Sequence, residues 1–241
     1  MRELSVAGRL AAWGSAVLAG TVSPDQAADE VVGGSDASHR VFGLPDESEG
    51  VTLPYALGRL RALGVGGLRL VLPRPGDPAG LPGPPVFNEK AIARGEAVIT
   101  VGGRPLGLVD EGRGAWSVHP VTADPRTPPS LADAERELGR AMRECTEALV
   151  SLDVARWEPV AADILAHRAR HERPALPMSA PPQAHRVLHQ ALRLASIVDA
   201  ARAGDGAAVS AGETARRAAI LREIDVAARR AVEAACSAPL T

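Results

Sequence analysis

Glycine and proline are concentrated in the first half of this chain and alanine in the second, and this change constrains the fold more than any other feature. Residues 1–129 hold 20 of the 24 glycines and 14 of the 20 prolines, whereas residues 130–241 hold 29 of the 45 alanines. Glycine and proline interrupt helices and form turns, while alanine has the highest helix propensity. The sequence therefore predicts a turn-rich first part and a helical second part.

The domain boundary is predicted at residues 119–130, where four of twelve residues are prolines. Such a composition is typical of a stiff connector. We expect a mixed α/β domain at residues 1–118, the proline-rich connector at 119–130, and an Ala-rich antiparallel helical bundle at 131–241. Ser130, followed by Asp133 three residues later, is typical of a helix N-terminus. Small and apolar residues then recur at a heptad-like spacing as far as Leu152.

The hydrophobic pattern of the first domain indicates both helices and strands. Helices are predicted at about residues 4–19, from residue 54 to 63, and at 86–93, and strands at 39–44, 68–72 and 116–121. Two apolar runs, 97–101 and 105–109, flank Gly102-Gly103 and predict a β-hairpin. A hairpin requires antiparallel strands. The predicted fold class is therefore α+β, with a small, partly antiparallel sheet, and not a doubly wound parallel sheet.

Charge and cysteine use narrow the functional classes. The 27 Lys+Arg and 29 Asp+Glu residues give a net charge of −2, which offers no electrostatic case for binding nucleic acid or a membrane. The two cysteines, Cys145 and Cys236, are too few for a disulfide framework, so we expect buried, reduced thiols in a cytoplasmic protein. An apolar run at residues 10–22 imitates a secretion signal, but its apolar residues recur with helical spacing, which favours an amphipathic core helix.

The sequence lacks the usual motifs for nucleophilic catalysis and phosphate binding. There is no Gly-x-Ser-x-Gly elbow. Gly64-Val-Gly66-Gly67 resembles part of a dinucleotide-binding fingerprint, but it follows a predicted helix and precedes a predicted strand, which is the reverse of the order that phosphate binding needs. Two His-x-x-x-His pairs, His167/His171 and His185/His189, have the spacing of shared metal ligands. The predicted helices would point these pairs more than about 100° apart. We therefore expect no metal site and no cofactor, and we assign no catalytic residue.

The segment at residues 73–90 is the best candidate for a binding site. Residues 73–85 contain six prolines and three glycines and directly follow a predicted strand, which indicates a long, pre-shaped loop. The segment contains four polar side chains with suitable chemistry: Arg74, Asp77, Asn88 and Lys90, the single lysine of the chain. An arginine and a lysine together suit an anion. In the structural alternative, Asp77 pairs with Arg74 and the loop only wraps the sheet.

The sequence leaves two functional hypotheses open. The first is a non-catalytic cytoplasmic protein, partner-binding or regulatory, that contacts a protein partner or a second copy of itself through its Ala-rich helices. The alternative is an enzyme or a protein that binds an anionic small molecule in a pocket at residues 73–90. Whether the chain is an enzyme stays open at this point, because many active sites are assembled from residues scattered along the sequence.

Overall fold

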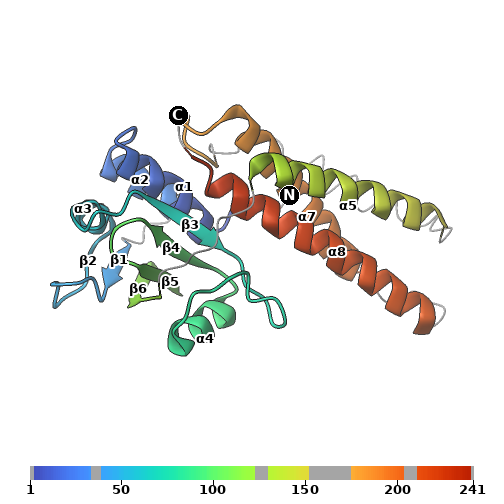
Figure 1. Cartoon of the computed structure of the whole chain (residues 1–241), viewed down its shortest axis with the longest axis horizontal. Helices are drawn as coiled ribbons and strands as arrows, with labels where there is room; N and C mark the ends of the chain where they lie inside the picture. Colours follow the sequence, from blue (N-terminus) through green and yellow to red (C-terminus); the bar gives the residue numbers. More distant parts are fainter. Residues whose placement is uncertain (1–2, 34–38, 123–129, 152–174, 204–210, 240–241) are drawn as a thin grey trace. The chain divides into compact units, whose positions relative to one another are not determined.

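The computed structural model describes residues 3–33, 39–122, 130–151, 175–203 and 211–239. The described elements are helices and one mixed sheet, which makes the protein α+β, as predicted. The chain folds as two compact units. The α/β unit comprises Leu4–Pro128, Leu176–Pro181 and Cys236–Thr241, and the helical unit comprises Met1–Glu3, Pro129–Ala175 and Pro182–Ala235. Figure 1 shows the elements of both.

The sheet of the α/β unit has six described strands in the order β2-β1-β6-β5-β4-β3. Their bounds are β1 Arg40–Phe42, β2 Val51–Thr52, β3 Gly67–Val71, β4 Ala97–Val101, β5 Leu106–Gly112 and β6 Ala115–Pro120. All neighbours pair antiparallel except β1 and β6, which are parallel. The predicted hairpin is confirmed as β4 and β5, with both residues of Gly102-Gly103 at positive φ. Short β2 and the parallel pairing of β1 were not predicted.

Helices cover the two faces of this sheet unequally (Figure 1). Helices α1 (Val6–Ala19), α2 (Pro24–Val32) and α3 (Leu53–Ala62) lie on one face, where α1 packs on β3 and α3 packs near β1 and β2. Helix α4 (Pro85–Arg94) lies on the other face against β5. Ser23 caps α2 by accepting the N–H of Gln26 at 3.2 Å.

The core beneath α4 is centred on Phe87. This side chain has no exposed surface and packs with a cluster of apolar residues: Val71, Ala91, Ala97, Ile99, Val109 and Val121. Gly107 of β5 lies directly under its ring, because a Cβ at that position would be 2.4 Å from a ring carbon. The missing side chain at Gly107 therefore lets α4 approach the sheet closely.

The free edge of β3 is protected by serine hydroxyls. The N–H of Leu68 donates to Oγ of Ser15 at 2.9 Å, and the same hydroxyl donates back to the carbonyl of Leu68 at 3.1 Å. Two residues on, the N–H of Leu70 donates to Oγ of Ser237 at 3.1 Å. Unpaired edge groups are templates for aggregation, so α1 and the segment after residue 235 protect this edge.

The helical unit contains α5 (Leu131–Ser151), α7 (Pro182–Ala203) and most of α8 (Ala211–Cys236). Ser130 accepts the N–H of Asp133 at 3.1 Å, which confirms the predicted cap of α5. Polar contacts join the helices: Gln183 of α7 donates to Glu135 of α5, and Arg230 of α8 pairs with Glu137 of α5. The predicted second helix of the bundle, with His167 and His171, lies outside the described residues.

The described residues bear on membrane insertion, cysteine chemistry and metal binding. Within the described ranges, no helix is both long and apolar enough to cross a membrane. Cys236 is a buried thiol, while the side chain of Cys145 lies outside the described residues. In the described parts of the chain, histidine, cysteine and acidic side chains do not assemble into a group of three that would hold a metal ion.

Candidate functional site

Two of the four predicted site residues form the loop itself. Arg74 and Asp77 exchange backbone hydrogen bonds, with N–H to carbonyl distances of 2.8 and 2.9 Å. The guanidinium of Arg74 donates to the carbonyl of Gly95, the C-cap of α4, at 3.3 Å. Oδ1 of Asp77 accepts the N–H of Ala79. These contacts close the loop and fasten it to the end of α4.

Asn88 and Lys90 lie on α4 and have different partners. Oδ1 of Asn88 accepts the N–H of Gly83 at 3.0 Å, which ties the first turn of the helix back to the loop. Lys90 extends away from the loop and its Nζ lies 2.6 Å from Oε1 of Glu111 on β5. Arg74, Asn88 and Lys90 are thus each engaged by a different partner, and of the four predicted residues Lys90 is the one that reaches the face of the sheet.

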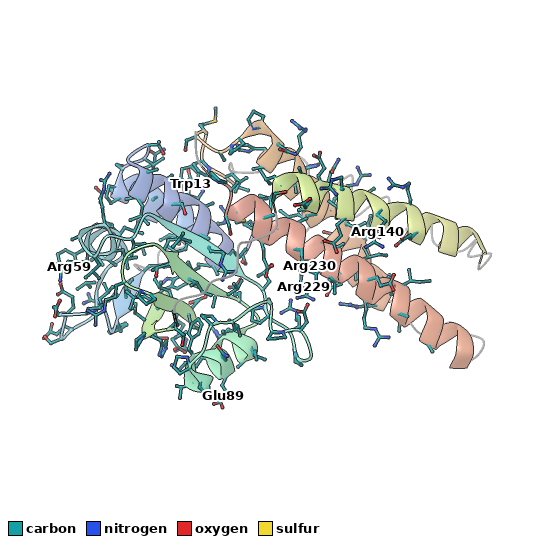
Figure 2. All side chains as sticks on the ribbon, viewed as in Figure 1. Trp13, Arg59, Glu89, Arg140, Arg229 and Arg230 are labelled. Atoms are coloured by element: carbon teal, nitrogen blue, oxygen red, sulfur yellow. The ribbon has the colours of Figure 1, made fainter. Side chains whose placement is uncertain are left out.

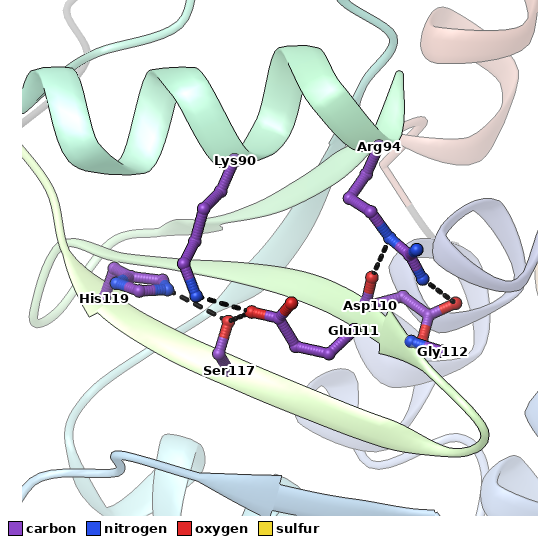
Figure 3. A network of polar contacts seen from close by, with 7 residues as sticks. All are labelled: Lys90, Arg94, Asp110, Glu111, Gly112, Ser117 and His119. Carbon is purple, nitrogen blue, oxygen red and sulfur yellow. Dashed lines mark hydrogen bonds and ion pairs between the residues drawn. The ribbon is translucent and has the colours of Figure 1, made fainter.

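Lys90 belongs to a chain of polar contacts that crosses β5 and β6 (Figure 3). Glu111 accepts a hydrogen bond from the hydroxyl of Ser117 at 2.5 Å, and that hydroxyl lies 2.9 Å from Nε2 of His119. Ser117 and His119 are two residues apart on β6, so they share a face of the sheet. Glu111 lies at an irregularity of the β5–β6 register between Asp110 and Gly112, where a bulge redirects side chains.

A second ionic contact holds the end of α4 to the same strand. Nε of Arg94 donates to the backbone carbonyl of Asp110, and its guanidinium lies 3.9 Å from the Asp110 carboxylate. Oδ1 of Asp110 also accepts the N–H of Gly112 at 2.9 Å. With Lys90 one turn earlier, Arg94 positions α4 over β5 (Figure 3).

The electrostatics of the network define its charge state. The hydrogen bond from Lys90 lowers the pKa of Glu111, and the hydrogen bond from Ser117 lowers it further. Burial lowers the pKa of His119, and the positive charge of Lys90 acts in the same direction against the opposing effect of Glu111. The ring of His119 also lies against Phe87, with centroids 6.1 Å apart. At neutral pH, Glu111 is therefore an anion and His119 a neutral imidazole.

The positions of the protons follow from these charges. A carboxylate only accepts hydrogen bonds, and a serine hydroxyl has a single proton to donate. Since Ser117 donates to Glu111, Nε2 of His119 must carry the N–H that donates to the Ser117 oxygen. In a Ser-His-acid triad the histidine accepts the serine proton instead. This arrangement therefore presents hydrogen-bonding groups and does not activate Ser117 as a nucleophile.

An aromatic side chain flanks this network on the neighbouring strand. Phe42 of β1 is in register with Ser117 of β6, so both side chains lie on the same face, and Phe42 is 45% exposed. Its ring lies over Gly50, where a Cβ would meet it at 2.2 Å. We call the surface formed by β1, β6 and their neighbours the β1–β6 strip, composed of Arg40, Phe42, Lys90, Glu111, Ser117 and His119.

Sequence reasoning found Lys90 but missed the rest of the strip. Glu111 lies 21 residues from Lys90, and nothing local in the sequence indicates their pairing. One available signal was the alternation of β6, in which Ser117 and His119 alternate with the buried Trp116 and Val118. That pattern identifies a polar face on a strand without showing which helix lies beside it.

Fold and site together define a two-unit α+β protein with a polar and aromatic surface strip on its α/β unit. Residues 7–134 match the family model described as Rv1486c-like protein, N-terminal domain, and residues 132–233 match the model for the C-terminal domain of the same proteins. The chain belongs to the Rv1486c-like protein family.

Two relatives from Mycobacterium tuberculosis are similar over most of their length. The uncharacterized protein Rv1486c of strain ATCC 25618 / H37Rv is 30% identical over 235 residues, which covers 78% of this chain and 80% of the relative. The uncharacterized protein MT1533 of strain CDC 1551 / Oshkosh has the same identity and coverage. No solved structure matches this chain significantly.

Proposed function

We propose that this protein is a non-catalytic partner-binding protein, and that its α/β unit holds a protein partner on the β1–β6 strip. The observation that carries the proposal is the register of β1 and β6, which places the exposed Phe42 beside the hydrogen-bonding Ser117. Aromatic side chains surrounded by hydrogen-bonding groups are typical anchors of protein interfaces. We infer a cytoplasmic location from the use of cysteine in the chain.

The ion pair between Lys90 and Glu111 suits a surface that exchanges partners. Both side chains are substantially exposed, at 42% and 38%. Exposed ion pairs contribute at most about 1 kcal/mol, so an incoming acidic group displaces Glu111 from Lys90 at low cost. The partner we propose is therefore a protein segment with an apolar side chain against Phe42 and a carboxylate against Lys90.

A photo-crosslinking experiment on the full chain tests this proposal. A photoreactive phenylalanine analogue replaces Phe42 in one version and Val101 in the matched control, since Val101 is also an exposed apolar residue, at 50%, on a strand of the same sheet. We expect a specific protein adduct from position 42 that disappears with Lys90→Ala and is absent from position 101. Equal adducts from both positions, or none from position 42, would contradict the proposal.

The anionic small-molecule alternative rests on a separate observation. Lys90 and His119 both approach Ser117, so an amine and an imidazole N–H lie near one hydroxyl (Figure 3). Arg74 does not join them, because its guanidinium is bonded to Gly95. Titration with inorganic phosphate, followed by NMR, distinguishes a protein partner from a small anionic ligand. Saturable chemical-shift changes at Ser117 and His119 that are lost in Lys90→Ala would favour the small anionic ligand.

Self-association through the Ala-rich helices stays a prediction. Sedimentation velocity of the full chain over a range of concentrations measures it directly. A concentration-dependent dimer that persists in Phe42→Ser would place the self-contact outside the β1–β6 strip.

A further inference from the structure

A buried histidine and a buried tryptophan are hydrogen-bonded at the base of the β1–β2 hairpin. Nε1 of Trp116 lies 3.2 Å from Nδ1 of His39, and the ring centroids are 6.2 Å apart. Trp116 has no exposed surface and His39 is 8% exposed. Water is therefore poorly placed to replace either partner.

The chemistry of this bond determines the protonation state of His39. An indole N–H donates and cannot accept, so Nδ1 of His39 must carry a lone pair and the ring must be neutral. Protonation would place a second N–H opposite that of Trp116. The bond would be lost, and a charged ring and an unpaired indole N–H would both stay buried, which is unfavourable.

Because His39 lies at the base of the short β1–β2 hairpin, loss of its bond to Trp116 affects this hairpin first. Strand β1 has three residues and β2 has two, and β1 joins the rest of the sheet through β6. At the same base, the carbonyl of His39 accepts the N–H of Leu53, and the N–H of Arg40 donates to the carbonyl of Gly114 at 2.7 Å. The pairing of β1 with β6 covers only three residues, so the bond between His39 and Trp116 adds a further link at one end of a short ladder.

We propose that His39 is a pH-sensitive latch, and that its protonation releases the β1–β2 hairpin from β6. The hairpin carries Arg40 and Phe42, so its release also dismantles the β1–β6 strip. That second consequence rests on the proposed function, whereas the latch does not.

Burial and one neighbouring carboxylate act in opposite directions on the pKa of His39. Burial lowers the pKa of His39, while the carboxylate of Asp110 on β5, itself near Arg94, acts in the opposite direction and is the weaker influence. Arg40 is adjacent in sequence, but its side chain lies on the opposite face of β1. A lowered folded pKa means that the stabilisation is complete above the ordinary histidine pKa of about 6.5 and is lost as the pH falls through the folded pKa.

Hydrogen exchange of the full chain, measured by NMR between about pH 8 and pH 5, tests the latch. After correction for intrinsic rates, protection of the Trp116 indole N–H and of the Arg40 and Leu53 amides should fall about tenfold per pH unit below about 6.5, and should level off below the folded pKa. Protection of β4 and β5 amides should not follow this dependence. Hairpin protection that tracks β4 and β5 at every pH would overturn the proposal.

Two variants make the test specific. In His39→Asn, the amide oxygen can accept the indole N–H at any pH, so protection of the hairpin should become independent of pH. In Trp116→Phe, the donor is gone, so the part of the pH dependence that the indole bond supplies should be lost, while the part due to burial of His39 stays. If the wild-type pH dependence survives in His39→Asn, another group is titrating and the latch is wrong. If His39→Asn does not fold, Trp116→Phe is the test, and an unchanged pH dependence of hairpin protection in that variant likewise contradicts the latch.

Discussion

The α/β unit and the helical unit fill their cores with side chains of different size. The α/β unit buries large residues such as Trp116 and Phe87 with no exposed surface, and Gly107 leaves space for the ring of Phe87. The helical unit instead buries a series of alanines on α8: Ala227, Ala228, Ala231, Ala234 and Ala235. Shape in the first unit depends on a few large side chains, whereas in the second it depends on close approach of helix backbones.

Both units also bury polar side chains: His39, Arg69 and Thr100 in the α/β unit, and Asp225 and Arg229 in the helical unit. The α/β unit buries a neutral His39 against an indole, while the helical unit buries Asp225 and Arg229 as an ion pair at 3.2 Å within α8. Arg202 of α7 also lies 3.7 Å from Asp225, and Figure 2 labels Arg229 and Arg230 among the side chains of α8. An Ala-rich interface has little shape specificity of its own, so charged pairs can supply the register between helices.

The largest effect is expected where a large side chain is removed from the α/β core. Phe87→Ala should lower the free energy of unfolding by about 3–5 kcal/mol, because it removes a fully buried ring and leaves a cavity under α4. Val86→Ala is the matched control, since Val86 is 61% exposed on the same helix and should stay within about 0.5 kcal/mol of wild type. Denaturant unfolding measures both, and similar losses would refute the contrast.

A smaller loss should follow from filling the gap at Gly107. The added methyl group of Gly107→Ala would lie 2.4 Å from the Phe87 ring, and overpacking of this kind costs about 1–3 kcal/mol. The clash requires the ring, so Gly107→Ala combined with Phe87→Leu should cost less than the sum of the two single changes. An additive double-mutant cycle would show that Gly107 is needed for another reason.

The helical unit should lose stability when one of its buried alanines is enlarged. Ala231 on α8 has no exposed surface, so Ala231→Leu adds volume to a closely packed interior. We expect the free energy of unfolding to fall by about 1–3 kcal/mol. Ala218→Leu, at an exposed position of the same helix, should stay within about 0.5 kcal/mol of wild type. Thermal and denaturant unfolding measure the stability of both variants. Equal stability of Ala231→Leu and Ala218→Leu would contradict the prediction.

The smallest effect on stability is expected at the binding strip. Lys90→Ala should cost less than about 1 kcal/mol, because its ion pair with Glu111 is exposed and screened. The variant removes the main cause of the lowered pKa of Glu111, so this pKa should rise in an NMR titration. The small contribution of the pair is present above the ordinary glutamate pKa and is lost as the pH falls through the lowered one. A large loss of stability would make Lys90 structural.

Elements that depend on neighbouring residues could be predicted from the sequence. The Gly102-Gly103 hairpin, the cap at Ser130 and the α+β class all follow from turn residues, capping residues and hydrophobic periodicity within a few positions. The loop at residues 73–90 was also recognised as an ordered feature, although its Arg74, Asp77 and Asn88 are engaged by the loop and by α4.

Pairings between distant residues were decided by the tertiary structure. Ser117 is 75 residues from its register partner Phe42, Trp116 is 77 from His39, and Ser237 is 167 from Leu70. Local sequence carries propensity and periodicity, but the partner of a strand or of a charge depends on which segments the whole chain brings together. The sequence by itself therefore determined most of the elements, though not the short β2, and the presence of Lys90. Only the packing of α4 over β5 and β6 determined which groups surround that lysine.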